Sequence, residues 1–166
     1  MVKKFIIIFI IVLFAAGCSY SVYTSEYPHL KTIQVIPFEN KTSEYYLSQD
    51  SQNELVRLFI SDGRLKINTQ NPDCTLKGSI LDYKKKIYSY DNSGNIKEYQ
   101  VSILFTLEFY DIKYAKIIYE SKSLVLSRTY TPNSNSENIL KTEEEAVNKI
   151  YSDLFDNIIK NTLESW

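Results

Sequence analysis

The regular alternation of apolar and polar residues over 96–111 constrains the fold more than any other part of the sequence. Six apolar side chains fall at every second position of this segment: Tyr99, Val101, Ile103, Phe105, Leu107 and Phe109. A period of two places them together on one face of a β-strand. Burial of each such side chain contributes about 1.5 to 3 kcal/mol before the entropy of ordering is subtracted. We therefore expect this strand to lie at the centre of the core.

Other extended segments lie on both sides of this strand in the sequence. Residues 74–90 predict a second long strand, joined to the first by Asp91-Asn92-Ser93-Gly94-Asn95, whose residue types favour a hairpin turn. Residues 117–130 predict a third strand, with Leu124, Leu126 and Tyr130 on one face. Shorter strands are expected over 32–38, closed by Pro37 and Asn40, and over 65–69.

Two segments show the spacing of amphipathic helices. Residues 46–61 carry Leu47, Leu55 and Phe59 at helical spacing, and Gly63 supplies the left-handed conformation that ends a helix. Thr142 and Glu145 form a capping box before a second, longer helix. The apolar stripe of that helix consists of Val147, Ile150, Tyr151, Leu154, Ile158 and Ile159.

The order strand, helix, strands, helix predicts an α+β fold. The simplest arrangement that buries every apolar stripe is a two-layer sandwich, with two helices packed on one face of a mostly antiparallel sheet of four to five strands. The other face of the sheet would stay open or meet a partner. The length of the segment predicts a single domain over 32–166.

The N-terminus is typical of a bacterial lipoprotein. Lys3 and Lys4 precede an apolar run over 5–16, and small residues lead from that run to Cys18. We expect a signal peptide over 1–17 and lipidation of Cys18. A transmembrane helix is the alternative, but the 12 residues of the run fall short of the roughly 20 that a bilayer requires.

The residues that follow Cys18 suggest where the protein is located. Ser19 stands where an aspartate often retains lipoproteins in the inner membrane, which favours a lipid-anchored place on the periplasmic side of the outer membrane. Residues 18–31 are polar and rich in tyrosine, contain Pro28 and show no periodicity, so they predict a tether.

Composition and missing motifs exclude several classes of function. Without the signal peptide the chain has 17 basic and 20 acidic residues, which argues against a nucleic-acid role. Cys74 has no partner for a disulfide once Cys18 is acylated, and we expect it to be a buried apolar filler. His29 is the only histidine, and no phosphate loop, hydrolase motif or cluster of metal ligands is present. We expect no enzyme, no cofactor and no metal site.

A basic stretch near the hairpin turn is the candidate ligand-binding site. Lys84, Lys85 and Lys86 stand among tyrosines, and Lys97 is expected across the ladder from them. Lysines pair with phosphates and aromatic rings cover acyl or sugar surface, so this stretch could hold an anionic amphiphile. The alternative is a solvated strand end that lysines protect from edge pairing.

Several segments, in their order and spacing, resemble the LPS-assembly lipoprotein LptE family. They are Cys18-Ser19-Tyr20-Ser21, the run over 30–42, Asp62-Gly63-Arg64-Leu65, the runs over 73–80 and 90–99, the Glu-rich start of the last helix, and Trp166. The resemblance covers essentially the whole chain after the signal peptide. It implies helices packed on a sheet, an anchor in the inner leaflet of the outer membrane, and a partner, the β-barrel LptD, in which family members sit as a plug.

The resemblance also implies binding of lipopolysaccharide through basic residues. It supplies no shared motif for those residues, so Lys84, Lys85, Lys86 and Lys97 rest on the pattern described above. Two other functions stay open at this point: a lipid-anchored periplasmic binding module for another envelope amphiphile, and a structural envelope lipoprotein.

Overall fold

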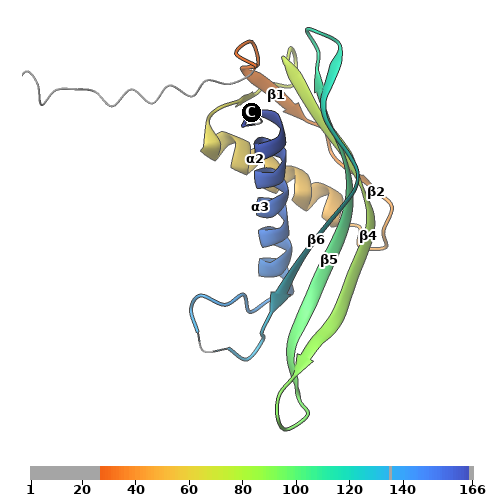
Figure 1. Cartoon of the computed structure of the whole chain (residues 1–166), viewed down its shortest axis with the longest axis vertical. Coiled ribbons are helices and arrows are strands. Elements are labelled where there is room, and N and C mark those ends of the chain that lie inside the picture. The colour runs from red at the N-terminus through yellow and green to blue at the C-terminus, as the bar shows by residue number, and fades with distance from the viewer. Residues whose placement is uncertain (1–26, 135, 165–166) are drawn as a thin grey trace, which may run out of the picture.

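The computed structural model describes residues 27–134 and 136–164. The predicted signal peptide and Cys18 lie outside these residues, as does Trp166. The described chain forms eight elements: β1 (Thr32–Val35), β2 (Glu39–Asn40), α2 (Leu47–Asp62), β3 (Lys66–Ile67), β4 (Cys74–Tyr90), β5 (Ile96–Asp111), β6 (Lys116–Tyr130) and α3 (Glu143–Thr162). They make two layers, with both helices on the same side of the long strands (Figure 1).

The strand predicted from the alternation is β5, and it lies in the middle of the long antiparallel part of the sheet, between β4 and β6. Its apolar face points to the helices, and the five residues from Val101 to Phe109 on that face are at most 2% exposed. Tyr99 is partly buried against the same core. The prediction of a central core strand is therefore confirmed.

The sheet itself differs from the prediction. It has six strands, not four to five, and it is mixed, not mostly antiparallel in its pairings. The strand β1 pairs parallel with both β3 and β4, and β2 also pairs parallel with β4. Parallel neighbours need a long crossover connection, and the segment that contains α2 provides it between β1 and β3.

Pro37 divides the single strand that was expected over 32–38. β1 ends at Val35 and β2 begins at Glu39, because a proline has no N–H to donate to a ladder. The two pieces still follow β4, since the Ile36 and Lys41 amides each donate to a β4 carbonyl at 2.9 Å.

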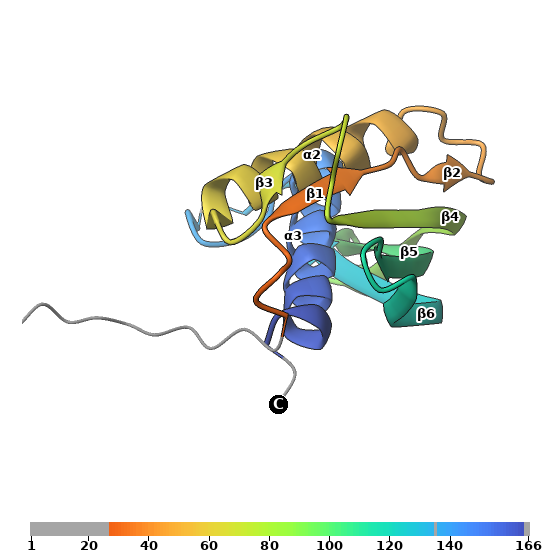
Figure 2. The ribbon, with the colours of Figure 1, turned by 90° about the horizontal axis from the view of Figure 1, so that it is seen from above.

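Both predicted helices are present with the expected ends. Gly63 has a φ of 77° and its amide donates to the Phe59 carbonyl at 3.1 Å, which closes α2. The capping box of Thr142 and Glu145 starts α3, and all six residues of the predicted stripe are buried. The helices cross one another (Figure 2), and the Phe59 ring meets the Phe155 ring edge-on at 4.9 Å.

The folded body begins earlier than Thr32, so the last part of the segment expected to be a tether is packed. Leu30 is buried, and His29 Nε2 lies 2.6 Å from Asp111 Oδ2 at the end of β5. The Lys31 and Thr32 amides donate to the Asp73 carboxylate. In the part of the chain that the structure describes, neither helix has an apolar stretch long enough for a membrane crossing.

Candidate functional site

The three consecutive lysines of β4 do not form one patch. A one-residue register shift after Ile80 changes which positions of β4 face the helices. Lys85 is consequently paired with the buried Val101, and its side chain lies on the face that the helices cover. Lys84 and Lys86 lie on the opposite, open face.

Lys85 is held inside a cluster that joins the hairpin to α3. Its ammonium group donates to Glu143 in the first turn of α3, and Glu143 also accepts from the Tyr83 hydroxyl. The Lys85 Nζ lies 5.5 Å from the Tyr99 ring centre and 6.0 Å from that of Tyr130. These two rings are stacked with their centres 5.4 Å apart. One lysine therefore combines an ion pair with two cation–π contacts.

The charges in this cluster stabilise one another. The bond to Glu143, with help from Tyr130, raises the pKa of Lys85 to about 12. Burial disfavours the charge on Glu143, but the bonds that Lys85 and Tyr83 donate outweigh it and lower its pKa. Burial, reinforced by Glu143, raises the pKa of Tyr83, which remains a donor. Lys85 is thus engaged within the protein, and Glu143 is its partner.

The remaining candidate lysines lie apart from Lys85. Lys84 Nζ lies 2.6 Å from Asp82 Oδ2 at the surface. Lys97 does not lie across from the lysine triplet as expected: register shifts near the turn leave it beside the β4–β5 connection, unpaired in the ladder. There it lines a groove of about 700 Å³, together with the 131–134 segment and Ile139.

A second groove, of about 680 Å³, lies between α2 and α3. Four of its nine lining residues are acidic: Asp50, Glu54, Glu143 and Glu144. The one cation in that lining, Arg57, is paired with Glu54 at 2.5 Å. Repulsion between like charges makes this groove unsuited to phosphate groups.

The histidine and the cysteine of the described residues are engaged or buried. No three His, Cys, Asp or Glu side chains come together there as a metal site would require. His29 is bonded to Asp111. Cys74 is fully buried, which confirms the expected filler, and burial raises the pKa of its thiol to about 12. A thiol in that state is a poor nucleophile.

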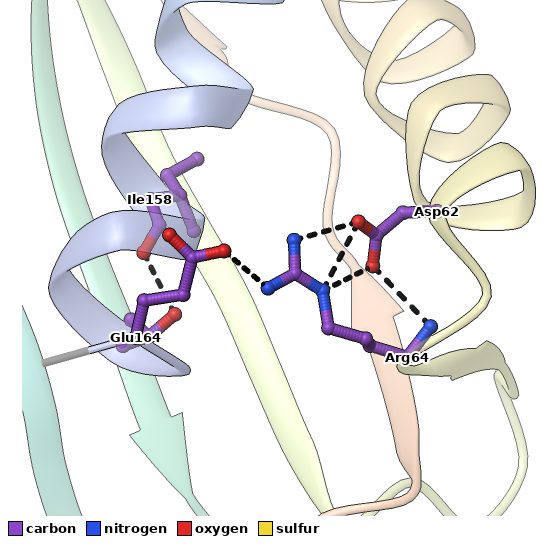
Figure 3. Close-up of polar contacts among 5 residues, drawn as sticks. Asp62, Arg64, Ile158 and Glu164 are labelled. Carbon is purple, nitrogen blue, oxygen red and sulfur yellow. Dashed lines mark hydrogen bonds and ion pairs between the residues drawn. The ribbon is translucent and has the colours of Figure 1, made fainter. Parts of the chain in front are cut away.

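Arg64, in the Asp62-Gly63-Arg64-Leu65 segment, ties together the C-terminal ends of the two helices (Figure 3). Its guanidinium donates to both oxygens of Asp62 at 2.7 to 3.1 Å and to Glu164 at 2.6 Å. The Asp62 carboxylate raises the pKa of Arg64, and the same bonds lower the pKa of Asp62. The Asp62-Gly63-Arg64-Leu65 segment therefore holds the C-terminal ends of α2 and α3 together.

Several solved structures are similar to this chain. The hypothetical protein CT253 from Chlamydia trachomatis has a TM-score of 0.51 at 13% identity, over 78% of this chain and 94% of that one. Lipoprotein B from Nitrosomonas europaea has a TM-score of 0.47 at 18% identity, over 79% and 81% of the two chains. A minor lipoprotein from Acinetobacter baumannii has a TM-score of 0.46 at 17% identity, over 79% and 89%.

Of these three structures, only the Chlamydia protein has a TM-score above 0.5. Because its sequence identity is 13%, the likeness shows the fold alone. No curated protein sequence matches this chain. A family model does: the model described as "LptE: Lipopolysaccharide-assembly" matches residues 30–162, which contain every strand and helix described above. The chain belongs to the LptE lipopolysaccharide-assembly family.

Proposed function

We propose that this protein is an outer-membrane lipoprotein, acylated at Cys18, that docks as a plug in an LptD-like β-barrel and assists the assembly of lipopolysaccharide at the cell surface. The observation that carries the proposal is the family match over residues 30–162. The role is one of binding and positioning, and it requires no catalytic group.

The open face of the sheet is suited to the polar interior of a barrel. On β5 this face carries Gln100, Ser102 and Thr106 between the core residues. The Ser102 and Ser127 hydroxyls are 2.7 Å apart across β5 and β6. Interiors of outer-membrane barrels are polar. On docking, the hydroxyl and amide groups of the sheet can therefore give up their hydrogen bonds to water and form hydrogen bonds to the barrel wall instead.

The basic residues available to a lipopolysaccharide phosphate are Lys84 and Lys86 on the open face and Lys97 beside the turn. Lys85 remains a proposed contact of weaker effect, because Glu143 already binds its ammonium group. An ammonium group can pair with phosphate as a point charge. The pair of Lys84 with Asp82 is more exposed to solvent than the pair of Lys85 with Glu143, so a phosphate can replace Asp82 more readily. We therefore assign the stronger contribution to Lys84 and Lys86.

Co-purification tests the barrel partner. The tagged protein is extracted in mild detergent, and co-purifying proteins are identified by mass spectrometry. We expect a large β-barrel protein to be recovered. Recovery without one would contradict docking, and a bound lipid other than lipopolysaccharide would favour a binding module for another envelope amphiphile. Depletion of the protein should reduce surface lipopolysaccharide, whereas a purely structural lipoprotein would leave its level unchanged.

Charge-removing substitutions test the lipopolysaccharide contacts. The Lys84→Gln, Lys86→Gln double variant should bind purified lipopolysaccharide more weakly than the parent protein. The Lys149→Gln, Lys160→Gln double variant removes two exposed lysines of α3, on the helical side, and serves as the control matched in charge. Equal binding by the Lys84→Gln, Lys86→Gln variant and the control would refute the assignment of Lys84 and Lys86.

A further inference from the structure

The turn between β5 and β6 exposes an apolar and basic surface. The surface consists of the connection Ile112-Lys113-Tyr114-Ala115 and the first two residues of β6, Lys116 and Ile117, and all six residues are exposed. Ile112 and Ile117 are 42% and 43% exposed, and Tyr114 is 62% exposed. The turn contains two lysines and no acidic residue. We refer to residues 112–117 as the anchor-end turn.

The requirements of a turn do not account for these residue types. The β4–β5 connection, Asp91-Asn92-Ser93-Gly94-Asn95, consists of polar turn formers and places Gly94 at a φ of 83°. The anchor-end turn instead places Ala115 at a φ of 50°, which a Cβ atom disfavours. Apolar and cationic residues therefore occupy this turn although glycine, asparagine or aspartate would form it with less strain.

Contacts join the anchor-end turn to the point where the chain enters the folded body. The Tyr114 ring packs edge-on against His29 with the ring centres 4.7 Å apart. The Tyr114 amide donates to Asp111 Oδ1 at 3.1 Å, and His29 binds the other oxygen of the same carboxylate. This surface and the start of the described chain thus form one unit.

The length of the N-terminal segment limits how far this unit can lie from a membrane. Eight residues lie between Cys18 and Tyr27, and a segment of this length spans at most about 30 Å. The β4–β5 turn lies at the other end of β5 (Figure 1). A strand of 16 residues is about 50 Å long. The N-terminal segment is therefore long enough to place an acylated Cys18 at the anchor-end turn but too short to place it at the opposite hairpin turn.

We propose that the anchor-end turn is a second membrane contact, which inserts Ile112, Tyr114 and Ile117 into the headgroup region of a phospholipid bilayer that contains anionic lipid. Tyrosine is enriched at the membrane interface, where its ring is covered and its hydroxyl stays hydrated. Lys113 and Lys116 face the lipid phosphates, to which a basic surface is attracted. The proposal rests on the proposed acylation of Cys18, which would bring this end of the protein to a bilayer surface.

This contact would fix the orientation of the protein. With the anchor-end turn at the bilayer surface, the β4–β5 hairpin projects away from that surface, and Figure 1 shows that this hairpin extends beyond the end of α3. The lysines of β4 would then be carried toward the lumen of the barrel and not held against the inner leaflet.

A tryptophan probe at each end of β5 tests the proposal. The acylated protein is reconstituted in vesicles of phosphatidylethanolamine and phosphatidylglycerol that contain a brominated lipid. Trp166→Phe provides the background, and Tyr114→Trp is compared with Tyr88→Trp, which changes a tyrosine of similar exposure, 57%, near the opposite turn. Both substitutions keep an aromatic side chain. Mass spectrometry establishes separately that Cys18 carries its lipid.

We expect the Tyr114→Trp variant to show a blue-shifted emission and strong quenching by the brominated lipid, and the Tyr88→Trp variant to show neither. Adding Lys113→Gln and Lys116→Gln to the Tyr114→Trp variant should reduce the quenching, as should 1 M salt. Equal quenching at the two positions, or none at position 114, would overturn the proposal. The vesicles contain no barrel protein, so this outcome is independent of the co-purification result.

Discussion

Replacing Lys85 with glutamine should destabilise the fold, whereas the same replacement of either neighbouring lysine should not. The three residues are adjacent in the sequence, and each substitution removes one positive charge. They differ in which face of β4 they occupy and in their partners. Lys85 faces α3 and pairs with Glu143, whereas Lys84, paired with Asp82 at the surface, and Lys86 face away from α3. The series therefore compares the buried side of the strand with its solvent-exposed side.

The expected cost follows from the contacts of Lys85. Its side chain is 42% exposed and that of Glu143 is 32% exposed, so solvent screening limits the ion pair to the range of about 0.2 to 1 kcal/mol that exposed pairs show. The contacts with the Tyr99 and Tyr130 rings add about 0.5 to 1 kcal/mol. Lys85→Gln should thus lower the free energy of unfolding by about 1 to 2 kcal/mol.

Urea unfolding of the purified protein, followed by circular dichroism at pH 7, measures this difference. With an m-value of about 2 kcal/mol per molar, the midpoint should fall by about 0.5 to 1 M for Lys85→Gln. The midpoints of Lys84→Gln and Lys86→Gln should stay within experimental error of the parent protein. A loss for Lys84→Gln equal to that for Lys85→Gln would refute the assignment of faces from the register.

Three further outcomes follow from the same structure. Gly78→Ala should lower the free energy of unfolding by about 1 to 3 kcal/mol, because a Cβ at this position would lie 2.2 Å from the Thr106 carbonyl oxygen and 3.2 Å from the Phe38 ring. An unchanged thermal midpoint in differential scanning calorimetry would contradict this. Cys74 should not be alkylated by iodoacetamide at pH 8 until the protein is unfolded, because burial raises the pKa of its thiol to about 12. Mass spectrometry of native and urea-treated samples measures the alkylation. Glu143 has a lowered pKa in the folded state, so the stability that its charge contributes is present above about pH 4.5 and is lost as the pH falls through the folded pKa. The difference in free energy of unfolding between the parent and Glu143→Gln should therefore shrink in acid. A constant difference from pH 7 to pH 3 would argue against this role of Glu143.

The local features of the fold could be predicted because each depends on residues close together in the sequence. The alternation in β5 requires only that one face be buried. The capping box needs Thr142 and Glu145 three positions apart, and the end of α2 needs Gly63 alone. These local signals do not depend on how the rest of the chain folds.

The strand pairings and the candidate site could not be predicted in the same way. Nothing in residues 32–35 indicates that β1 pairs parallel with two other strands, because that choice depends on where α2 returns the chain. The single-residue register shift after Ile80 decides whether odd or even positions of β4 face the helices. Without it, Lys84 and Lys86 would have faced α3 and Lys85 would have faced outward, so the lysine triplet could not be resolved into faces from the sequence.

The position of β1 has a consequence for the order in which the sheet can form. β1 lies between β3 and β4, both of which follow it in the sequence, and its pairing with β4 extends to Leu76. A chain that is made from its N-terminus cannot complete these pairings until the residues up to Leu76 are available. Closing such a distant contact is slow compared with local hairpin formation. The N-terminal part of the folded body can therefore be fixed only once the start of β4 has reached it.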